Sequence, residues 1–149
     1  MSLQNHLHQQ LERMHTMEAL LKSEQALLGE GKVDGAALEA LAKEKQKLFA
    51  DLEESELKRR KAQERLGYPL NSEGSEQAAL DSNCGGLWQQ LITTTEAVAH
   101  LNALNGDLIQ HRLQHNQQML NILRDAAGTN LYGPDGQSNK SMPRVSSKA

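Results

Sequence analysis

The strongest constraint on the fold is one long stretch, from Leu87 to Ala127, that contains no proline and a single interior glycine, Gly106. Along it, residues recur in alternating steps of four and three, the spacing of a helix that meets other helices in coiled-coil fashion. We call this line the seam, and it consists of Leu87, Leu91, Thr94, Val98, Leu101, Asn105, Leu108, Arg112, His115, Met119 and Ile122. The pattern predicts one long amphipathic helix.

A second line of residues accompanies the later part of this helix. It starts at Ile109 and also advances in fours and threes, and because each residue turns the helix by about 100°, it lies beside the seam. We call it the stripe, and it consists of Ile109, Leu113, Asn116, Leu120, Leu123 and Ala127. One apolar face is enough for a helix to pack, so the second face needs its own explanation.

Two further helices precede this stretch. The first, over residues 3–28, repeats the spacing through Leu3, Leu7, Gln10, Met14, Met17, Leu21, Glu24 and Leu28. Asp34 is suited to cap the second helix, over residues 35–66, because its carboxylate accepts unpaired amide hydrogens. That helix continues the spacing through Leu38, Leu41, Lys45, Leu48, Leu52, Ser55, Arg59, Ala62 and Leu66. Polar residues replace leucine after Leu52, so we expect the far end to pack less tightly.

The remaining segments are polar. Residues 67–85 are rich in Ser, Asn and Gly and predict a connecting loop, in which Glu76–Leu80 could form one helical turn. Residues 128–149 predict a flexible C-terminal tail. The expected fold is therefore all-α: an antiparallel bundle of three long helices, about 3–28, 35–66 and 86–127, within a single bundle domain of residues 1–127.

Composition narrows the function classes. The chain has 149 residues and a net charge of −3, which gives no reason to expect a nucleic-acid partner. Its single cysteine forms no internal disulfide, and no apolar run approaches the roughly 20 residues that span a bilayer. We expect a soluble protein of a reducing compartment, without membrane insertion.

Catalytic and metal chemistry have weak support. His111 and His115 are four residues apart on one helix, but Arg112 follows His111 where a metalloprotease has glutamate, and no third ligand is evident. Cys84 stands near a helix N-terminus, which can lower a thiol pKa, yet no base accompanies it. We therefore expect no enzyme, no metal and no cofactor.

Geometry suggests a use for the stripe. If the long helix starts level with Leu66 and runs back along the second helix, it outruns that helix by roughly nine residues, from Met119 to Ala127. We therefore expect Ile109, Leu113, Met119, Leu120 and Leu123 to form an exposed surface for a partner's helix. The alternative is that the loop, the tail or a second copy of the chain covers this face. The polar seam residues Asn105, Arg112 and His115 are expected to keep this part loosely packed.

Beyond the helix, Leu131 and Tyr132 are two apolar residues in a polar surrounding, followed by a Pro-Asp-Gly turn signal. They either dock back on the bundle or serve as a short motif for a partner. Composition alone leaves both interpretations open.

Three runs of residues resemble the flagellar export chaperone FlgN family. They are Leu104-Asn105-Gly106-Asp107-Leu108-Ile109, then His115-Asn116-Gln117-Gln118 with Leu123, and finally Asn130-Leu131-Tyr132-Gly133-Pro134-Asp135-Gly136-Gln137. The resemblance covers about residues 101–137, and the N-terminal half shares only the helical pattern.

The resemblance implies a cytoplasmic chaperone of type III flagellar export. Such a chaperone binds client proteins before their export, here the hook–filament junction proteins FlgK and FlgL, prevents their premature assembly and delivers them to the export apparatus. Carried over to this sequence, client binding falls on Ile109, Leu113, Asn116, Met119, Leu120 and Leu123. Docking to the export-gate protein FlhA falls on Leu131, Tyr132 and Gly133. The alternative is a structural coiled-coil adaptor that homodimerises through the same helix face.

Overall fold

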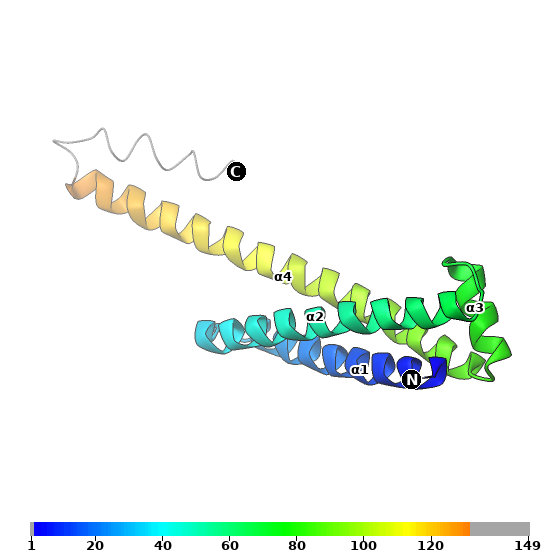
Figure 1. Ribbon diagram of the computed structural model, residues 1–149. Coiled ribbons are helices and arrows are strands. Elements are labelled where there is room, and N and C mark those ends of the chain that lie inside the picture. Colours follow the sequence, from blue (N-terminus) through cyan, green and yellow to red (C-terminus); the bar gives the residue numbers. More distant parts are fainter. Residues whose placement is uncertain (1, 132–149) are drawn as a thin grey trace. The chain divides into compact units, whose positions relative to one another are not determined.

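The structure is a computed structural model that describes the backbone of residues 2–131 and the side chains of residues 2–126. The described chain forms four helices, α1 (Leu3–Leu28), α2 (Gly35–Arg65), α3 (Ser72–Asp81) and α4 (Gly85–Leu131) (Figure 1). No strand occurs within this range, which confirms the all-α class. The count of three helices is not confirmed, because a fourth, short helix, α3, accompanies the three long ones in the segment predicted to be a loop.

The chain divides into two compact units, Met1–Asn105 and Gly106–Ala149. We call them the N-terminal unit and the C-terminal unit. The boundary falls inside α4, so the N-terminal unit contains α1, α2, α3 and α4 as far as Asn105.

Side-chain caps fix the starts of the first two helices. The Ser2 hydroxyl accepts a hydrogen bond from the Asn5 amide, 3.2 Å away. The Asp34 carboxylate accepts one from the Ala37 amide at 3.0 Å, which confirms the predicted cap of α2. Each cap satisfies an amide that has no partner within its own helix, so the helix starts are determined locally.

Contacts between α1 and α2 run in opposite directions along the two helices. Gln10, near the start of α1, donates a hydrogen bond to Glu56, late in α2, at 2.9 Å. Glu24, near the end of α1, pairs with Lys45, earlier in α2, at 3.5 Å. The short connection of residues 29–34 therefore joins two antiparallel helices, which lie side by side in Figure 1.

The first part of α4 packs on α1 in the same direction. Leu91 belongs to a core cluster with Leu7, and Leu101 packs against the cluster around Leu21. The seam is therefore the packed face of α4 within the N-terminal unit, where Leu91 is 3% exposed.

Residues 67–85 were predicted to be a loop with at most one helical turn, but Ser72–Asp81 form the helix α3. The sequence gives little sign of this helix because the residues that it buries are small. Ala78 and Ala79 are 0% and 1% exposed, and Gly74 and Ser75, four residues earlier, are also buried. Small residues at this spacing let a helix approach its neighbour closely, but they contribute little to an apolar pattern in the sequence. Asn71 caps α3 by accepting a hydrogen bond from the Gly74 amide at 2.7 Å.

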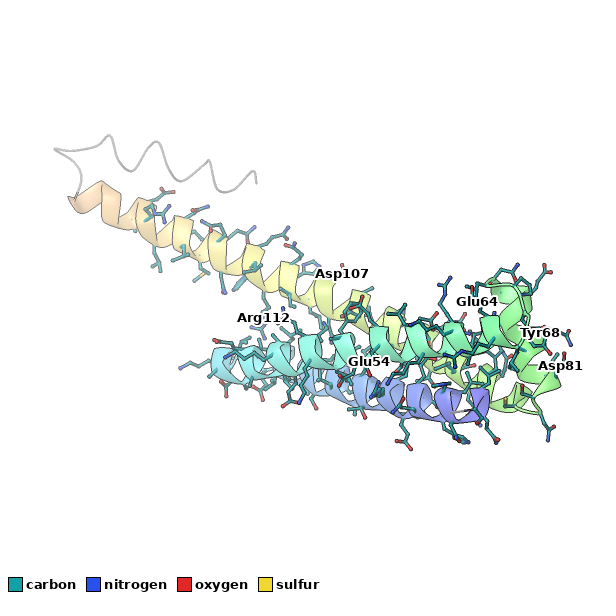
Figure 2. All side chains as sticks on the ribbon, in the orientation of Figure 1. Glu54, Glu64, Tyr68, Asp81, Asp107 and Arg112 are labelled. Atoms are coloured by element: carbon teal, nitrogen blue, oxygen red, sulfur yellow. The ribbon has the colours of Figure 1, made fainter. Side chains whose placement is uncertain are left out.

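A second contact closes the α3 segment from its other end. The Tyr68 hydroxyl donates a hydrogen bond to Asp81 at 2.5 Å, and the two side chains are labelled in Figure 2. This bond raises the pKa of Tyr68 and, together with a bond from Gln77, lowers the pKa of Asp81. This hydrogen bond thus joins the residues before α3 to the last residue of α3.

The expectation that the far end of α2 packs less tightly is also wrong. Ser55, Arg59, Ala62 and Gln63 are buried, whereas Leu38, Leu41 and Leu48 in the earlier part are only half-buried. The polar side chains at the far end are buried because each of the three finds hydrogen-bond partners there, and a satisfied polar group costs little to bury.

Arg59 is the centre of this buried polar group. Its guanidinium donates to Gln63 at 2.7 Å, to Ser75 of α3 at 3.3 Å and twice to Glu56, at 3.0 and 2.8 Å. It also lies 5.1 Å from the ring centroid of Trp88 in α4. Burial opposes ionisation of Glu56, but hydrogen bonds from Arg59 and Gln10 hold its pKa below the ordinary value. Arg59 thereby connects α2 with α3 and α4.

Candidate functional site

The exposed face of α4 in the C-terminal unit is the first candidate site. All six residues predicted to contact a client lie on it and are exposed: Ile109, Leu113, Asn116, Met119, Leu120 and Leu123. Leu113 is 58% exposed, Leu120 51% and Leu123 61%. Their spacing of four and three residues places the stripe members on one side of the helix.

The later seam residues add to this apolar surface. Met119 is 46% exposed and Ile122 61% exposed, although both occupy seam positions. Ile122 is absent from the residues predicted to contact a client, whereas Met119, another seam residue, is among them. No side chain from 106 to 126 is buried, so seam and stripe together form the apolar surface of this helix.

The polar seam residues differ in what they do. Asn105 is 0% exposed, and its amide donates to the Leu21 carbonyl and to Glu24, each at 2.9 Å. Asn105 therefore belongs to tight packing in the N-terminal unit, against the expectation of loose packing. His115 is exposed, and Arg112 is half-buried and takes part in further interactions.

Asn105 belongs to a network that links three helices. Glu24, 5% exposed, accepts from Asn105 of α4 and lies 3.5 Å from Lys45 of α2. A buried carboxylate is tolerated only when such partners surround it. This network marks the last residue of the N-terminal unit, one residue before Gly106.

The histidine and cysteine side chains considered for metal binding or catalysis do not lie together. His111 and His115 are both exposed on α4, and the described residues contain no group of three or more histidine, cysteine or acidic side chains placed to hold a metal ion. Cys84 is buried in the core cluster, and burial raises the pKa of its thiol, which opposes formation of the reactive thiolate.

The predicted docking motif falls at the edge of the described chain. Leu131 is the last residue of α4, so the helix extends four residues beyond the predicted end at 127, and the side chain of Leu131 is not described. Tyr132 and Gly133 lie outside the described residues.

A groove on the N-terminal unit is a surface that the sequence interpretation missed. α1 forms its floor, and α2 and α4 form its walls. Phe49 and Leu57 line it although they are 60% and 61% exposed. The available signal was that both apolar side chains lie off the line of spacing that packs α2.

Among the described residues, no helix is both long and apolar enough to cross a membrane.

An all-helical fold with an exposed apolar helix face has the features of a protein-binding module. The profile of the family described as FlgN protein matches residues 1–140. The chain belongs to the FlgN family.

Relatives agree with this assignment over most of their length. The flagella synthesis protein FlgN of Yersinia enterocolitica is 30% identical over 136 residues, 91% of this chain and 88% of the relative. The protein of the same name from Proteus mirabilis is 30% identical over 89% of this chain and 87% of its own. That of Escherichia coli strain K12 is 27% identical over 85% and 82%. No solved structure gives a significant match.

Proposed function

We propose that this chain is a cytoplasmic chaperone of flagellar export that binds the junction proteins FlgK and FlgL through the apolar face of α4. By occupying them it prevents premature assembly, and it delivers them to the export apparatus. Two findings support the proposal: the chain belongs to the FlgN family, and relatives that cover most of its length are named flagella synthesis proteins.

The observation that carries the proposal is the stripe. Ile109, Leu113 and Leu120 are large apolar side chains at helical spacing, 38%, 58% and 51% exposed. An amphipathic helix of a client can lay its own apolar face along them, the mode in which one helix recognises another.

Magnitudes favour reversible binding by this surface. Five side chains carry it, namely Ile109, Leu113, Met119, Leu120 and Leu123. Full burial of such a side chain contributes about 1.5–3 kcal/mol, so covering five that are already half-covered contributes roughly 4–8 kcal/mol. Association costs about 4–15 kcal/mol in lost freedom of motion, which is of similar size. These five side chains alone therefore give weak binding, which suits a chaperone that must release its client.

For delivery, we propose that Leu131, Tyr132 and Gly133 dock on the export-gate protein FlhA. This step follows from the family resemblance of the Leu-Tyr-Gly block. Replacing Tyr132 with alanine is expected to abolish binding to FlhA while leaving client affinity unchanged, as measured by separate titrations with each partner.

The client site is tested with purified full-length protein and a fluorescently labelled C-terminal segment of FlgK. The double variant Leu113→Glu, Leu120→Glu places two charges on the stripe and is expected to weaken binding at least about tenfold. Its matched control is Gln114→Glu, Gln118→Glu, which adds two charges on other faces of the same helix and is expected to bind normally.

Light scattering with and without the FlgK segment separates the proposal from its alternative. A monomer that forms a one-to-one complex supports the chaperone. A homodimer that stays unchanged by the segment, and that the stripe variant dissociates, identifies a coiled-coil adaptor instead. Circular dichroism of the stripe variant checks the fold, because a loss of helix would mean that the stripe is part of the core.

A further inference from the structure

The groove on the N-terminal unit has the form of a helix bundle that lacks one helix. It has a volume of about 1,200 Å³ and is lined only by residues from 10 to 102, all within the N-terminal unit. Along α1 it extends from Gln10 to Glu24, about 21 Å at 1.5 Å per residue. That length accommodates roughly four turns of a helix.

The floor of the groove is apolar between Gln10 and Glu24, which lie at its two ends, and one wall is incompletely covered. Met17, Leu21 and Leu52 are buried members of a core cluster that also line it. Above them on α2, Phe49 and Leu57 are largely exposed. A large aromatic side chain left in water beside an apolar floor is a feature of interaction sites more than of closed cores.

The wall formed by α4 continues the pattern of the stripe. Five residues of this wall and the later stripe residues follow one another in unbroken steps of four and three: Trp88, Ile92, Thr95, Ala99, Asn102, Gly106, Ile109, Leu113, Asn116, Leu120 and Leu123. The residues of the groove wall and the stripe residues therefore form one line at helical spacing along the sequence of α4. This continuity argues for the same partner at both places.

The charges around the groove describe the occupant. The α2 wall carries Lys45, Glu53, Glu56, Arg59 and Arg60, of which Glu56 and Arg59 pair with each other, whereas the α4 wall carries no charged side chain. A fitting helix is apolar toward the floor, has charges of both signs along the flank that faces α2, and is uncharged along the flank that faces α4.

We propose that the groove binds a second amphipathic helical segment, about 14 residues long, of the same client that the stripe binds. This inference rests on the proposed function, because it assigns the groove to that client. A second surface on the same client would also increase the affinity, which is low for the five side chains on α4 alone. Loss of contact at either surface would then release the client.

The test uses full-length protein and full-length FlgK. Phe49→Glu places a charge in the groove, and Ala50→Glu, at the next position outside the groove, is its matched control. Phe49→Glu is expected to weaken binding at least about tenfold, and Ala50→Glu is expected to leave it unchanged. The double stripe variant, Leu113→Glu with Leu120→Glu, is measured in parallel.

The two measurements separate the two proposals. If Phe49→Glu has no effect while the stripe variant loses binding, the groove inference fails and the proposed function stands. If the stripe variant binds normally, the proposed client surface fails, whatever the groove variant does.

A photo-crosslinking residue at position 49 identifies the occupant even if Phe49→Glu disturbs folding. A crosslink to FlgK from position 49, and none from position 50, supports the inference. A crosslink from position 49 only to a second copy of the chain, or only to the chain's own C-terminal residues, overturns it.

Discussion

At the scale of single residues, the polar side chains of the N-terminal unit decide which helices meet and where. Asn105 is placed opposite Leu21 and Glu24, and Arg59 opposite Ser75 and Trp88. Hydrogen bonds have fixed lengths and directions, so each of these groups accepts one alignment of its helices, whereas leucines tolerate several.

Asn105→Ala should destabilise the protein by about 1–3 kcal/mol, because it removes two hydrogen bonds and leaves the buried Glu24 carboxylate with fewer partners. Urea unfolding followed by circular dichroism measures the change. The control is Asn102→Ala, one turn earlier on α4, where the side chain is exposed. Equal stability of the two variants would contradict the role given to Asn105.

His6 should make stability depend on pH. It is 8% exposed, and burial, with the N-terminal ammonium, Lys58 and Arg65 nearby, lowers its pKa below 6.5. The unfolded state therefore binds the proton first as pH falls. The stabilising contribution is complete above about pH 6.5 and decreases below it, by at most about 1.4 kcal/mol per pH unit.

Urea titrations at about pH 7.5 and about pH 5.5 measure this dependence, and His6→Leu should reduce it. His8→Leu, an exposed neighbour on the same helix, serves as the control and should retain it. A slope that is the same in all three proteins would rule out His6 as its source.

At the scale of elements, α3 depends on close approach of its backbone to the preceding segment. A Cβ atom at Gly74 would clash with the carbonyl of Pro69, whose oxygen already accepts a hydrogen bond from Gln63 at 2.7 Å. The backbone has little freedom to move there, because the Asn71 cap and the Arg59 group hold both sides.

Gly74→Ala should therefore destabilise the protein by about 1–3 kcal/mol, the usual range for overpacking. Thermal unfolding followed by circular dichroism gives the comparison with Gly86→Ala, whose added methyl group would enter open space. If both variants melt at the same temperature, the approach of α3 to Pro69 is not restrictive.

The elements also show what the sequence predicts well and what it does not. Leucines at helical spacing located the three long helices, and Asp34 located the start of α2. α3 was missed because Ala78 and Ala79 bury little apolar area, although their positions are fully covered. The tight far end of α2 was missed because Arg59 and Gln63 are buried by pairing across helices, which a pattern along one helix does not reveal.

The candidate sites follow the same division. The stripe residues can be predicted from the sequence because two apolar lines run along one helix. Their exposure agrees with the interpretation of the stripe as a surface. The groove was not predicted, because it depends on Phe49 of α2 and Ile92 of α4 lining one space, which only the fold determines.

At the scale of the whole molecule, burial is unevenly distributed along α4. Leu91, Thr94 and Asn105 are buried in the N-terminal unit, whereas no side chain from 106 to 126 is buried. Most helical stability in proteins comes from packing rather than from intrinsic propensity, and Gly106 lowers that propensity further.

Amides after Gly106 should consequently exchange hydrogen faster than amides between Leu87 and Asn105, with protection lower by at least about tenfold. Hydrogen exchange measured by mass spectrometry on the full chain tests this. Addition of FlgK should slow exchange in the later part if the client covers it. Equal protection along α4 in the free protein would contradict the expectation.

The position of Trp88 has a consequence for spectroscopy. It is the only tryptophan of the chain, it lies on the groove wall, and the Arg59 guanidinium is 5.1 Å from its ring centroid. Indole fluorescence depends on the polarity of its surroundings, so a helix that enters the groove and displaces water should shift the emission to shorter wavelength. A ligand that contacts only residues beyond Gly106 should leave the emission unchanged. The intrinsic fluorescence of the unlabelled protein therefore distinguishes binding in the groove from binding on the stripe.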